Sequence, residues 1–348
     1  MKYTLHIKLV NCFLLVVLYV TTIACSSKRD DETLRFFHLG NIEMKKGNDV
    51  EAIRYYNEAV RLDPTYPDAY NNRGIAYIKY GDYQKAIADF SNALRFASDY
   101  HEAMFNRAQA YDKAGQLDNS LADLNKLSEV YKDSAKVFLS RGGVLAAKND
   151  FVKALPDYNR AIQLSPKLTE AYVNRGVVNY NLHYFPEAEA DFKKAIELDN
   201  KQDFAYNNLA QIYIRKQDYK QANELLEKAI TLSPHQPYYL NNRGFVKMQT
   251  GYIEEGLADI KQSILANPKN GWAYRNLGVY YILTKNYADA LTNLQKAQQL
   301  TSGIELIHYY IGQAYNGLGN KTEACKEWEL SKNLGDTEAE SVLKANCS

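Results

Sequence analysis

The sequence repeats itself every 34 residues, and this period constrains the fold more than any other feature. With Thr33 as the first position, nine copies run to Glu338 without insertion or deletion, and we number the positions of each copy as columns. Column 8 holds only small residues: Gly40, Gly74, Ala108, Gly142, Gly176, Ala210, Gly244, Gly278 and Gly312. Columns 20 and 27 are also small, except for Leu127. Because one such unit cannot bury its apolar side alone, the copies are expected to stack.

The columns also predict the secondary structure inside each copy. Small side chains at fixed places indicate two helices that cross closely, and large residues in columns 4, 11 and 24 fill the space around them. Glycine in column 15 ends the first helix in several copies, and proline after column 31 ends the second. The sequence therefore predicts an all-α protein of tandem helix pairs.

With these residues the chain resembles the tetratricopeptide-repeat (TPR) family. The matching residues of the second copy are Tyr70, Gly74, Tyr77, Ala86, Phe90 and Ala93, and Pro64 closes the first copy in the same way. The resemblance covers residues 33–338 and implies nine antiparallel helix pairs in a right-handed superhelical solenoid. Residues 339–348 are expected to form a C-terminal capping helix over the last core face.

Charged residues co-occur in two columns. Column 7 is arginine in five copies, and column 23 is aspartate in the same five. We predict five structural ion pairs between the two helices of a repeat: Arg73 with Asp89, Arg107 with Asp123, Arg141 with Asp157, Arg175 with Asp191, and Arg243 with Asp259. Such pairs fix which helices pack together more than they add stability.

A candidate partner-binding groove follows from the resemblance, which implies that first-helix residues line an inner, concave face. This face is apolar in copies five to eight and wetter in copies one to three. The predicted groove residues are Val173, Val177, Tyr180, Phe204, Ile214, Tyr238, Phe245, Met248, Trp272, Val279, Ile282 and Leu283. They form either a groove for a peptide or a packing surface between neighbouring repeats.

The N-terminus has the features of an export signal. Two lysines precede an apolar run from Cys12 to Val20, which is too short for a comfortable membrane span. Residues 1–24 resemble a bacterial lipoprotein signal peptide, which implies lipidation of Cys25. Residues 25–32 form a charged tether, which either directs export to the cell surface or is a plain linker. The expected location is the bacterial cell envelope, with a lipid anchor in the outer membrane and an unspecified facing.

Cysteine usage gives a second prediction for the same compartment. Once the signal is removed and Cys25 is lipidated, Cys325 and Cys347 are the two cysteines left in the folded part. An oxidising envelope would allow a disulfide between them, and the alternative is two separate small apolar side chains.

Nothing in the sequence supports an enzyme. The six histidines share no metal-ligand spacing, and no phosphate-binding loop or nucleophile motif is present, so no metal or cofactor is expected. A net charge of +1 gives no basic field for nucleic acid. Some TPR proteins bind C-terminal carboxylates through a clamp, of which Asn41 and Asn72 match two places while Phe37, Glu102 and Asn106 break the pattern.

The predicted function is therefore a non-enzymatic interaction scaffold that binds an unidentified protein or peptide. Two alternatives stay open: a solenoid that self-assembles into a homo-oligomer, and recognition of glycan or peptidoglycan by the tyrosine- and asparagine-rich face.

Overall fold

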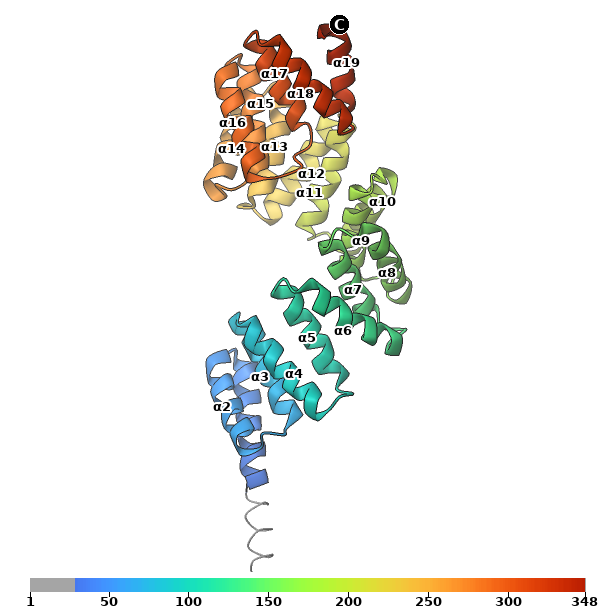
Figure 1. The fold of residues 1–348 in the computed structure, drawn as a ribbon, viewed down its shortest axis with the longest axis vertical. Coiled ribbons are helices and arrows are strands. Elements are labelled where there is room, and N and C mark those ends of the chain that lie inside the picture. Colours follow the sequence, from blue (N-terminus) through green and yellow to red (C-terminus); the bar gives the residue numbers. More distant parts are fainter. Residues whose placement is uncertain (1–28, 348) are drawn as a thin grey trace, which may run out of the picture. The chain divides into compact units, whose positions relative to one another are not determined.

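The structure, a computed structural model, describes residues 29–347, and Figure 1 shows the chain as a succession of helices. No strand occurs within that range. The predicted signal peptide and Cys25 lie outside the described residues. Residues 29–32, which we expected in the tether, are helical and belong to the first helix, which the structure describes over residues 29–46.

The chain divides into two units at residues 166 and 167, and each is a stack of antiparallel helix pairs. The N-terminal unit holds the first helix and α2 (Asp49–Leu62), α3 (Pro67–Tyr80), α4 (Tyr83–Phe96), α5 (His101–Lys113), α6 (Leu117–Val130), α7 (Ala135–Ala147) and α8 (Phe151–Leu164). These helices are the first four predicted repeats.

The C-terminal unit contains the other five repeats and the cap. Its helices are α9 (Thr169–Asn181), α10 (Phe185–Leu198), α11 (Asp203–Arg215), α12 (Tyr219–Leu232), α13 (Pro237–Gln249), α14 (Ile253–Ala266), α15 (Gly271–Leu283), α16 (Tyr287–Leu300), α17 (Ile307–Gly317), α18 (Lys321–Asn333) and α19 (Thr337–Asn346). The capping helix α19 begins at Thr337, inside the 34-residue period of the ninth copy, and continues into residues 339–346. The predicted all-α class of tandem helix pairs is confirmed.

A close approach between columns 8 and 24 holds the two helices of a repeat together. In the second repeat the Phe90 ring lies on the backbone of Gly74, where an added Cβ would be 2.7 Å from a ring carbon. Phe90 is fully buried there. In the third repeat column 8 is Ala108, and the facing residue is the narrower Leu124. The size of one side chain thus matches the space left by the other, as close packing requires.

A left-handed residue in column 15 turns the chain from the first helix of each repeat into the second. Gly47, Gly81, Gly115, Gly251 and Gly319 have φ between 74° and 90°, as the sequence predicted. The other four repeats keep the same turn without glycine, at Asn149, His183, Gln217 and Lys285, with φ between 59° and 62°. Side chains other than glycine are strained in this region, so packing of the two helices imposes the turn there.

Replacing Lys285 by glycine should therefore stabilise the protein. Lys285 is exposed, and its backbone has φ +61°. Relief of the left-handed strain, partly offset by the greater freedom of glycine when unfolded, should add about 0.5–1 kcal/mol. Urea unfolding followed by circular dichroism measures this. Gly251→Ala is the matched control: nothing lies within 4 Å of the added Cβ, yet φ is +90°, so this variant should lose stability.

Arginine forks join the helices of the five repeats that carry the charged columns. In each, the arginine Nε and Nη2 donate to the two carboxylate oxygens of the aspartate on the second helix, at 2.6–3.0 Å. All five aspartates are buried, with exposed fractions of 3–6%. The partners are those proposed from the sequence.

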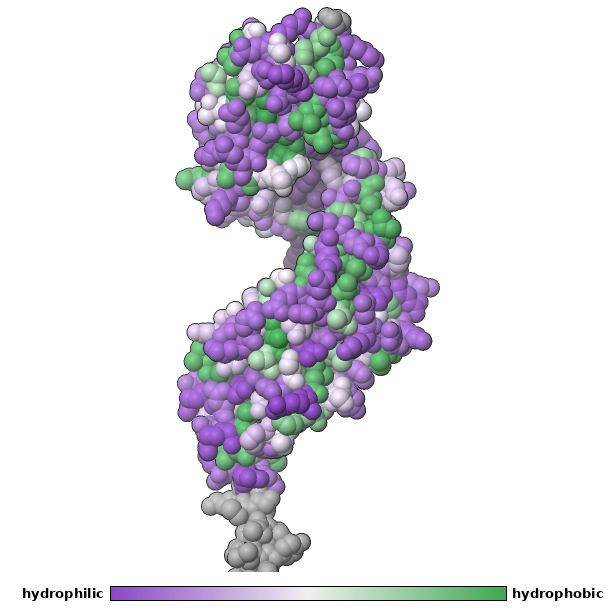
Figure 2. Space-filling model, viewed as in Figure 1, coloured by the Kyte–Doolittle hydropathy of each residue, from purple (hydrophilic) through white to green (hydrophobic). Residues whose placement is uncertain are grey.

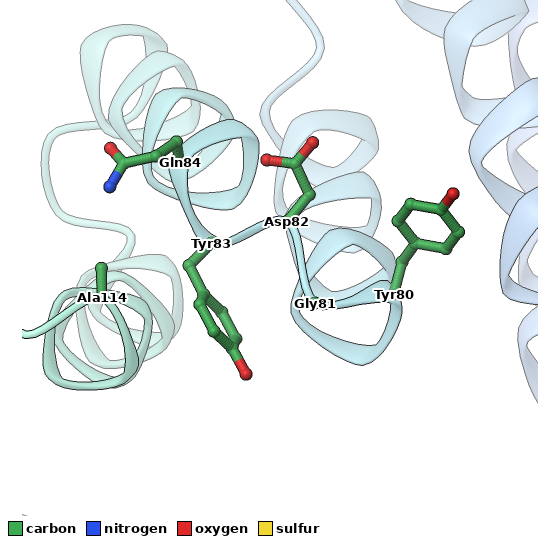
Figure 3. Close-up of a pocket in the computed structure, with 6 residues that line it drawn as sticks. All are labelled: Tyr80, Gly81, Asp82, Tyr83, Gln84 and Ala114. Carbon is green, nitrogen blue, oxygen red and sulfur yellow. The ribbon is translucent and has the colours of Figure 1, made fainter.

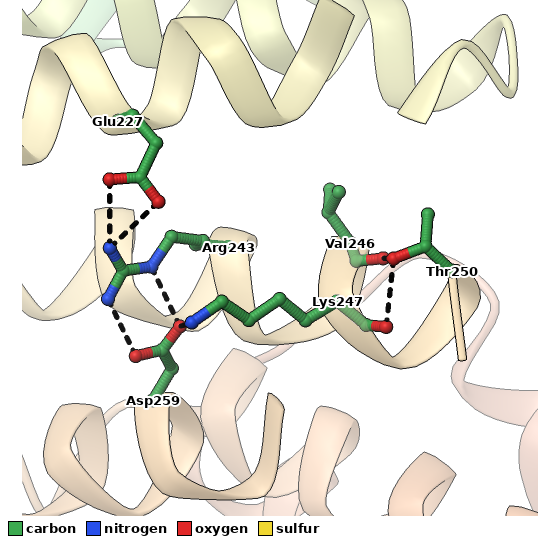
Figure 4. Close-up of polar contacts among 6 residues, drawn as sticks. All are labelled: Glu227, Arg243, Val246, Lys247, Thr250 and Asp259. Atoms are coloured by element: carbon green, nitrogen blue, oxygen red, sulfur yellow. Dashed lines mark hydrogen bonds and ion pairs between the residues drawn. The ribbon is translucent and has the colours of Figure 1, made fainter. Parts of the chain in front are cut away.

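The forks also reach the preceding repeat, which the sequence pattern did not indicate. The Nη1 atoms of Arg73, Arg107, Arg141 and Arg243 each donate to column 25 of the second helix one repeat earlier: Asn57, Ser91, Asn125 and Glu227. Figure 4 shows the Arg243 case, in which Lys247 Nζ adds a contact of 2.9 Å to Asp259. One guanidinium therefore holds three helices.

Removing one partner of such an ion pair should lower the free energy of unfolding strongly, whereas replacing both partners by apolar residues should lower it much less. Arg107→Leu leaves the buried Asp123 carboxylate without its counter-ion and should lower the free energy of unfolding by about 3–5 kcal/mol. The double variant Arg107→Leu with Asp123→Leu should recover most of that loss, because no charge stays buried. Guanidinium chloride unfolding of both single variants and the double variant measures it. A double variant as unstable as the sum of the two single variants would contradict the pairing.

Candidate partner-binding site

The first helices of the C-terminal unit enclose a cavity of about 980 Å³, lined also by the start of α19. Nine predicted groove residues line it: Tyr180, Phe204, Ile214, Tyr238, Phe245, Trp272, Val279, Ile282 and Leu283. They come from α9, α11, α13 and α15, and residues of α17 complete the wall. Cavities of this size and mixed lining are typical ligand sites.

Three predicted groove residues do not line this cavity. Val173 and Met248 are buried, with exposed fractions of 7% and 3%, and Val177 packs against the core beside Phe192. Met248 contacts a cluster that includes Ile260 of the second helix. These three side chains pack between and within repeats, which is the alternative to a groove that the sequence left open.

Aromatic side chains provide much of the exposed apolar part of the cavity wall. Phe204 and Tyr238 are each 47% exposed although both are large, and Leu283 is 44% exposed. Trp272 and Phe245 are partly buried, because one side of each packs against the core clusters of α15–α17 and α13–α15. The wall therefore offers both exposed and half-buried apolar contacts, which suits an apolar anchor from a partner.

Asparagine amides connect the first helices of successive repeats along the same face. The column 6 amide of one repeat donates to the column 5 amide of the repeat before it. The links within the C-terminal unit are Asn242 Nδ2 to Asn207 Oδ1 at 2.9 Å and Asn276 Nδ2 to Asn241 Oδ1 at 2.8 Å. Asn106 Nδ2 and Asn71 Oδ1 make the same link in the N-terminal unit, at 3.0 Å. The ladder sets the spacing of the helices behind the cavity.

The asparagine ladder ends at α15, where column 5 holds Arg275 in place of asparagine. The Arg275 guanidinium carbon lies 5.3 Å from the ring centroids of Phe245 and Trp272 and 5.6 Å from that of Tyr310. Among the described residues no carboxylate forms an ion pair with it, and its Nε is buried without a hydrogen-bond acceptor. Burial lowers the pKa of Arg275, against opposing effects of Tyr310 and Glu305. An arginine stays charged even so, and ring contacts stabilise it only in part.

A second arginine on the cavity is already neutralised. Arg215 of α11 forms an ion pair with Glu305, which precedes α17 and lies 90 residues further along the chain. The Arg215 guanidinium also lies over the Phe185 ring at 4.3 Å. This contact joins the sixth and ninth repeats, so the first helices curve round the cavity. Burial raises the pKa of Tyr180, which faces the same pair.

A smaller hollow of about 410 Å³ lies in the N-terminal unit at the turn between α3 and α4 (Figure 3). Two of its polar side chains already have partners, since the Asp82 carboxylate accepts from the Lys85 backbone N–H and Gln84 accepts from Gln116. In Figure 3 the side chains of Tyr80 and Tyr83 point in different directions rather than toward a common point. This hollow lacks the convergent groups of a binding site.

Two residues of the carboxylate-clamp pattern also lie in the N-terminal unit. Asn72 Nδ2 donates to Asn41 Oδ1 at 2.8 Å, and the Tyr56 hydroxyl donates to the same oxygen at 2.6 Å. Both side chains are thus bonded within the chain.

The wider surface adds few candidates. On the face shown in Figure 2, apolar residues occur in small groups among hydrophilic ones. Within residues 29–347, no three His, Cys, Asp or Glu side chains are grouped so as to hold a metal ion. In the same range, no helix combines the length and apolar character that crossing a membrane requires.

Comparison with known proteins assigns the family. Models described as tetratricopeptide repeat match residues 67–100, 102–134, 169–202 and 203–236. A model described as TPR repeat matches residues 40–81 and 142–182, so together they cover more than half of the chain. The chain belongs to the tetratricopeptide-repeat family. A search of curated proteins finds no match.

Solved structures share the TPR fold at low identity. A tetratricopeptide repeat protein from Parabacteroides merdae aligns with a TM-score of 0.59 and 18% identity, over 72% of this chain and 99% of that one. A chain of the APC/C hetero-tetramer Cut9–Hcn1 aligns with a TM-score of 0.61 and 15% identity, over 90% of this chain and 76% of that one. IFIT1 with Gppp-AAAA aligns with a TM-score of 0.52 and 14% identity, over 76% of this chain and 69% of that one. Proteins of this fold are generally non-catalytic scaffolds.

Proposed function

We propose that this TPR protein is a non-enzymatic scaffold, lipid-anchored in the bacterial cell envelope, that binds a protein or peptide partner in the cavity of its C-terminal unit. The observation that carries the proposal is the pair of half-exposed aromatic residues Phe204 and Tyr238 on the wall of that cavity. Exposing two large apolar side chains on one concave face is unfavourable in water and is typical of interaction sites.

The chemistry of the wall favours a polypeptide ligand. A peptide carries apolar side chains together with backbone N–H and C=O groups that need partners when they are buried. Beside the aromatic residues the cavity presents side-chain amides, among them Gln211, Gln249 and Gln313, which both donate and accept hydrogen bonds. Cut9 in its hetero-tetramer with Hcn1 provides a precedent for this fold in a protein assembly.

The envelope location rests on the N-terminal sequence and on the two cysteines of the last helices. The Cys325 and Cys347 sulfur atoms lie 1.99 Å apart, which joins α18 to the end of α19. We propose that this disulfide forms in the cell, where it would fasten the capping helix. Its formation requires an oxidising compartment, and the predicted export, with Cys25 as the lipidated residue, would deliver the chain to one.

Removing the exposed aromatic contacts should abolish partner binding and leave the fold intact. Phe204→Ser with Tyr238→Ser changes side chains that are each about half exposed, so the stability loss should be small. Site-specific crosslinking in intact envelopes, followed by mass spectrometry, measures which proteins the wild type and the variant contact. We expect at least one contact of the wild type to disappear from the variant.

The matched control for that experiment is Leu265→Ser, which removes an 83% exposed apolar residue of α14 that does not line the cavity. The Leu265→Ser variant should keep every crosslinked protein that the wild type contacts. If the cavity variant retains the same contacts as the wild type, or if both recover only further copies of the chain, the binding proposal is wrong. Self-assembly would then account for the exposed aromatic residues.

Cys25→Ser should release the protein from membranes. A lipid chain contributes about 0.8 kcal/mol per buried CH₂, so its loss removes the anchor while the TPR unit still folds. Membrane fractionation measures this. The same extracts report the disulfide: Cys325 and Cys347 should react with an alkylating reagent only after reduction. Equal partition of wild type and variant, or free thiols in the native protein, would contradict the envelope assignment.

A further inference from the structure

We propose that Arg275 is a recognition residue of the cavity and that it pairs with a carboxylate of the bound polypeptide. The inference rests on the proposed function and names the chemistry of its partner. It follows from a guanidinium on the wall of this cavity whose Nε is buried without a hydrogen-bond acceptor and which, among the described residues, forms no ion pair.

The neighbours of Arg275 make it an incomplete site. Every other arginine discussed above has a carboxylate partner, either the fork aspartate or, for Arg215, Glu305. Arg275 instead lies among three rings, and its buried Nε donates to nothing. Leaving a buried charged donor unsatisfied is expensive, whereas a charge-assisted bond to an incoming carboxylate recovers that cost.

The asparagine ladder explains why the site stands at this repeat. At the two preceding steps, a column 5 amide oxygen accepts from the column 6 amide of the next repeat. Column 5 of α15 is Arg275, a donor, and column 6 of α17 is Tyr310. Because a guanidinium has no acceptor atom, the direction of the last step is reversed: Arg275 donates toward the Tyr310 hydroxyl, and its buried Nε is left without an acceptor. A ligand oxygen would satisfy that Nε donor.

A neighbouring acceptor favours a peptide over other anions. Asn276 Oδ1 is buried without a hydrogen-bond donor, although its Nδ2 donates to Asn241. Consecutive residues of α15 thus offer one free donor and one free acceptor, which match a carboxylate and a peptide N–H.

The charge of the lining also limits the anion. The ionic side chains on the cavity are Arg215, Arg275, Glu305, Asp336 and Glu338, that is, two cations and three anions. This negative excess repels a doubly charged phosphate more strongly than a single carboxylate, whose one charge Arg275 balances. The aromatic wall then receives an apolar side chain next to the acidic group.

The test uses an array of ten-residue peptides rich in Phe, Leu and Tyr, each in three forms. The first has a central Glu and an amidated C-terminus, the second a central Gln and an amidated C-terminus, and the third a central Gln and a free C-terminus. Fluorescence polarisation measures their affinity for the purified chain. We expect at least one acidic form to bind about tenfold tighter than its neutral form. The first and third forms distinguish a side-chain carboxylate from a terminal one.

Four variants assign that preference to the residue. Arg275→Gln should reduce acidic peptides to the affinity of neutral ones, and Arg275→Lys should restore part of the difference. Glu305→Gln should increase the affinity for acidic peptides, because it removes a competing anion and frees Arg215. Arg95→Gln is the matched control, since Arg95 lies over the Phe96 ring at 4.6 Å outside the cavity, in the N-terminal unit. It should bind as the wild type does.

The outcomes separate the two proposals. If neutral peptides bind in the cavity and Phe204→Ser abolishes their binding, but acidic forms gain nothing, the carboxylate inference is wrong and the proposed function stands. If the preference survives Arg275→Gln, another residue carries it and the inference is again wrong. Absence of all peptide binding overturns both. Should Arg275→Gln fail to fold, the response to Glu305→Gln decides, and an unchanged or weaker affinity for acidic peptides overturns the inference.

Discussion

The close approach of the two helices in each repeat is the constraint on which the rest of the structure depends. A ring, a leucine or an isoleucine in column 24 lies directly on the backbone or Cβ of column 8, and this contact fixes the separation of the pair. The separation in turn forces the connecting residue into the left-handed region. At Gln217 and Lys285 the turn is kept although no glycine relieves it. Helix packing therefore outweighs local backbone preference in this array.

The arginine forks act at the next level, between repeats. A buried aspartate and an arginine are poor sources of net stability, because burial raises the pKa of Asp89 even though Arg73 acts in the opposite direction. The forks matter more for the arrangement of the helices than for stability. A planar guanidinium with donors on two edges admits one arrangement of three helices, so the forks fix the stacking register that close packing alone leaves less defined. The sixth, eighth and ninth repeats lack the fork, and their first helices line the cavity.

Much of this fold could be predicted from the sequence because the period is unbroken. The helix pairs, their glycine turns and the fork partners all depend on contacts within one repeat, where a column number defines a position in space. Contacts across several repeats could not be predicted in this way. Arg215 and Glu305 are 90 residues apart, and their contact depends on the summed rotation of every helix pair between them. Val173 and Met248 show the same limit, since the column assigns the face but not the burial.

Arg275 was missed for a different reason, although the sequence carried a signal. The eighth copy reads Arg-Asn-Leu-Gly at residues 275–278, where the second and seventh copies read Asn-Asn-Arg-Gly at residues 71–74 and 241–244. The arginine has moved two positions toward the N-terminus, which on a helix is about 200° of rotation, and leucine occupies the fork position. The same residue type thus passes from the side that binds the second helix to the concave side. In this array, the arginine out of its column marks the position where the proposed recognition site departs from the common scaffold.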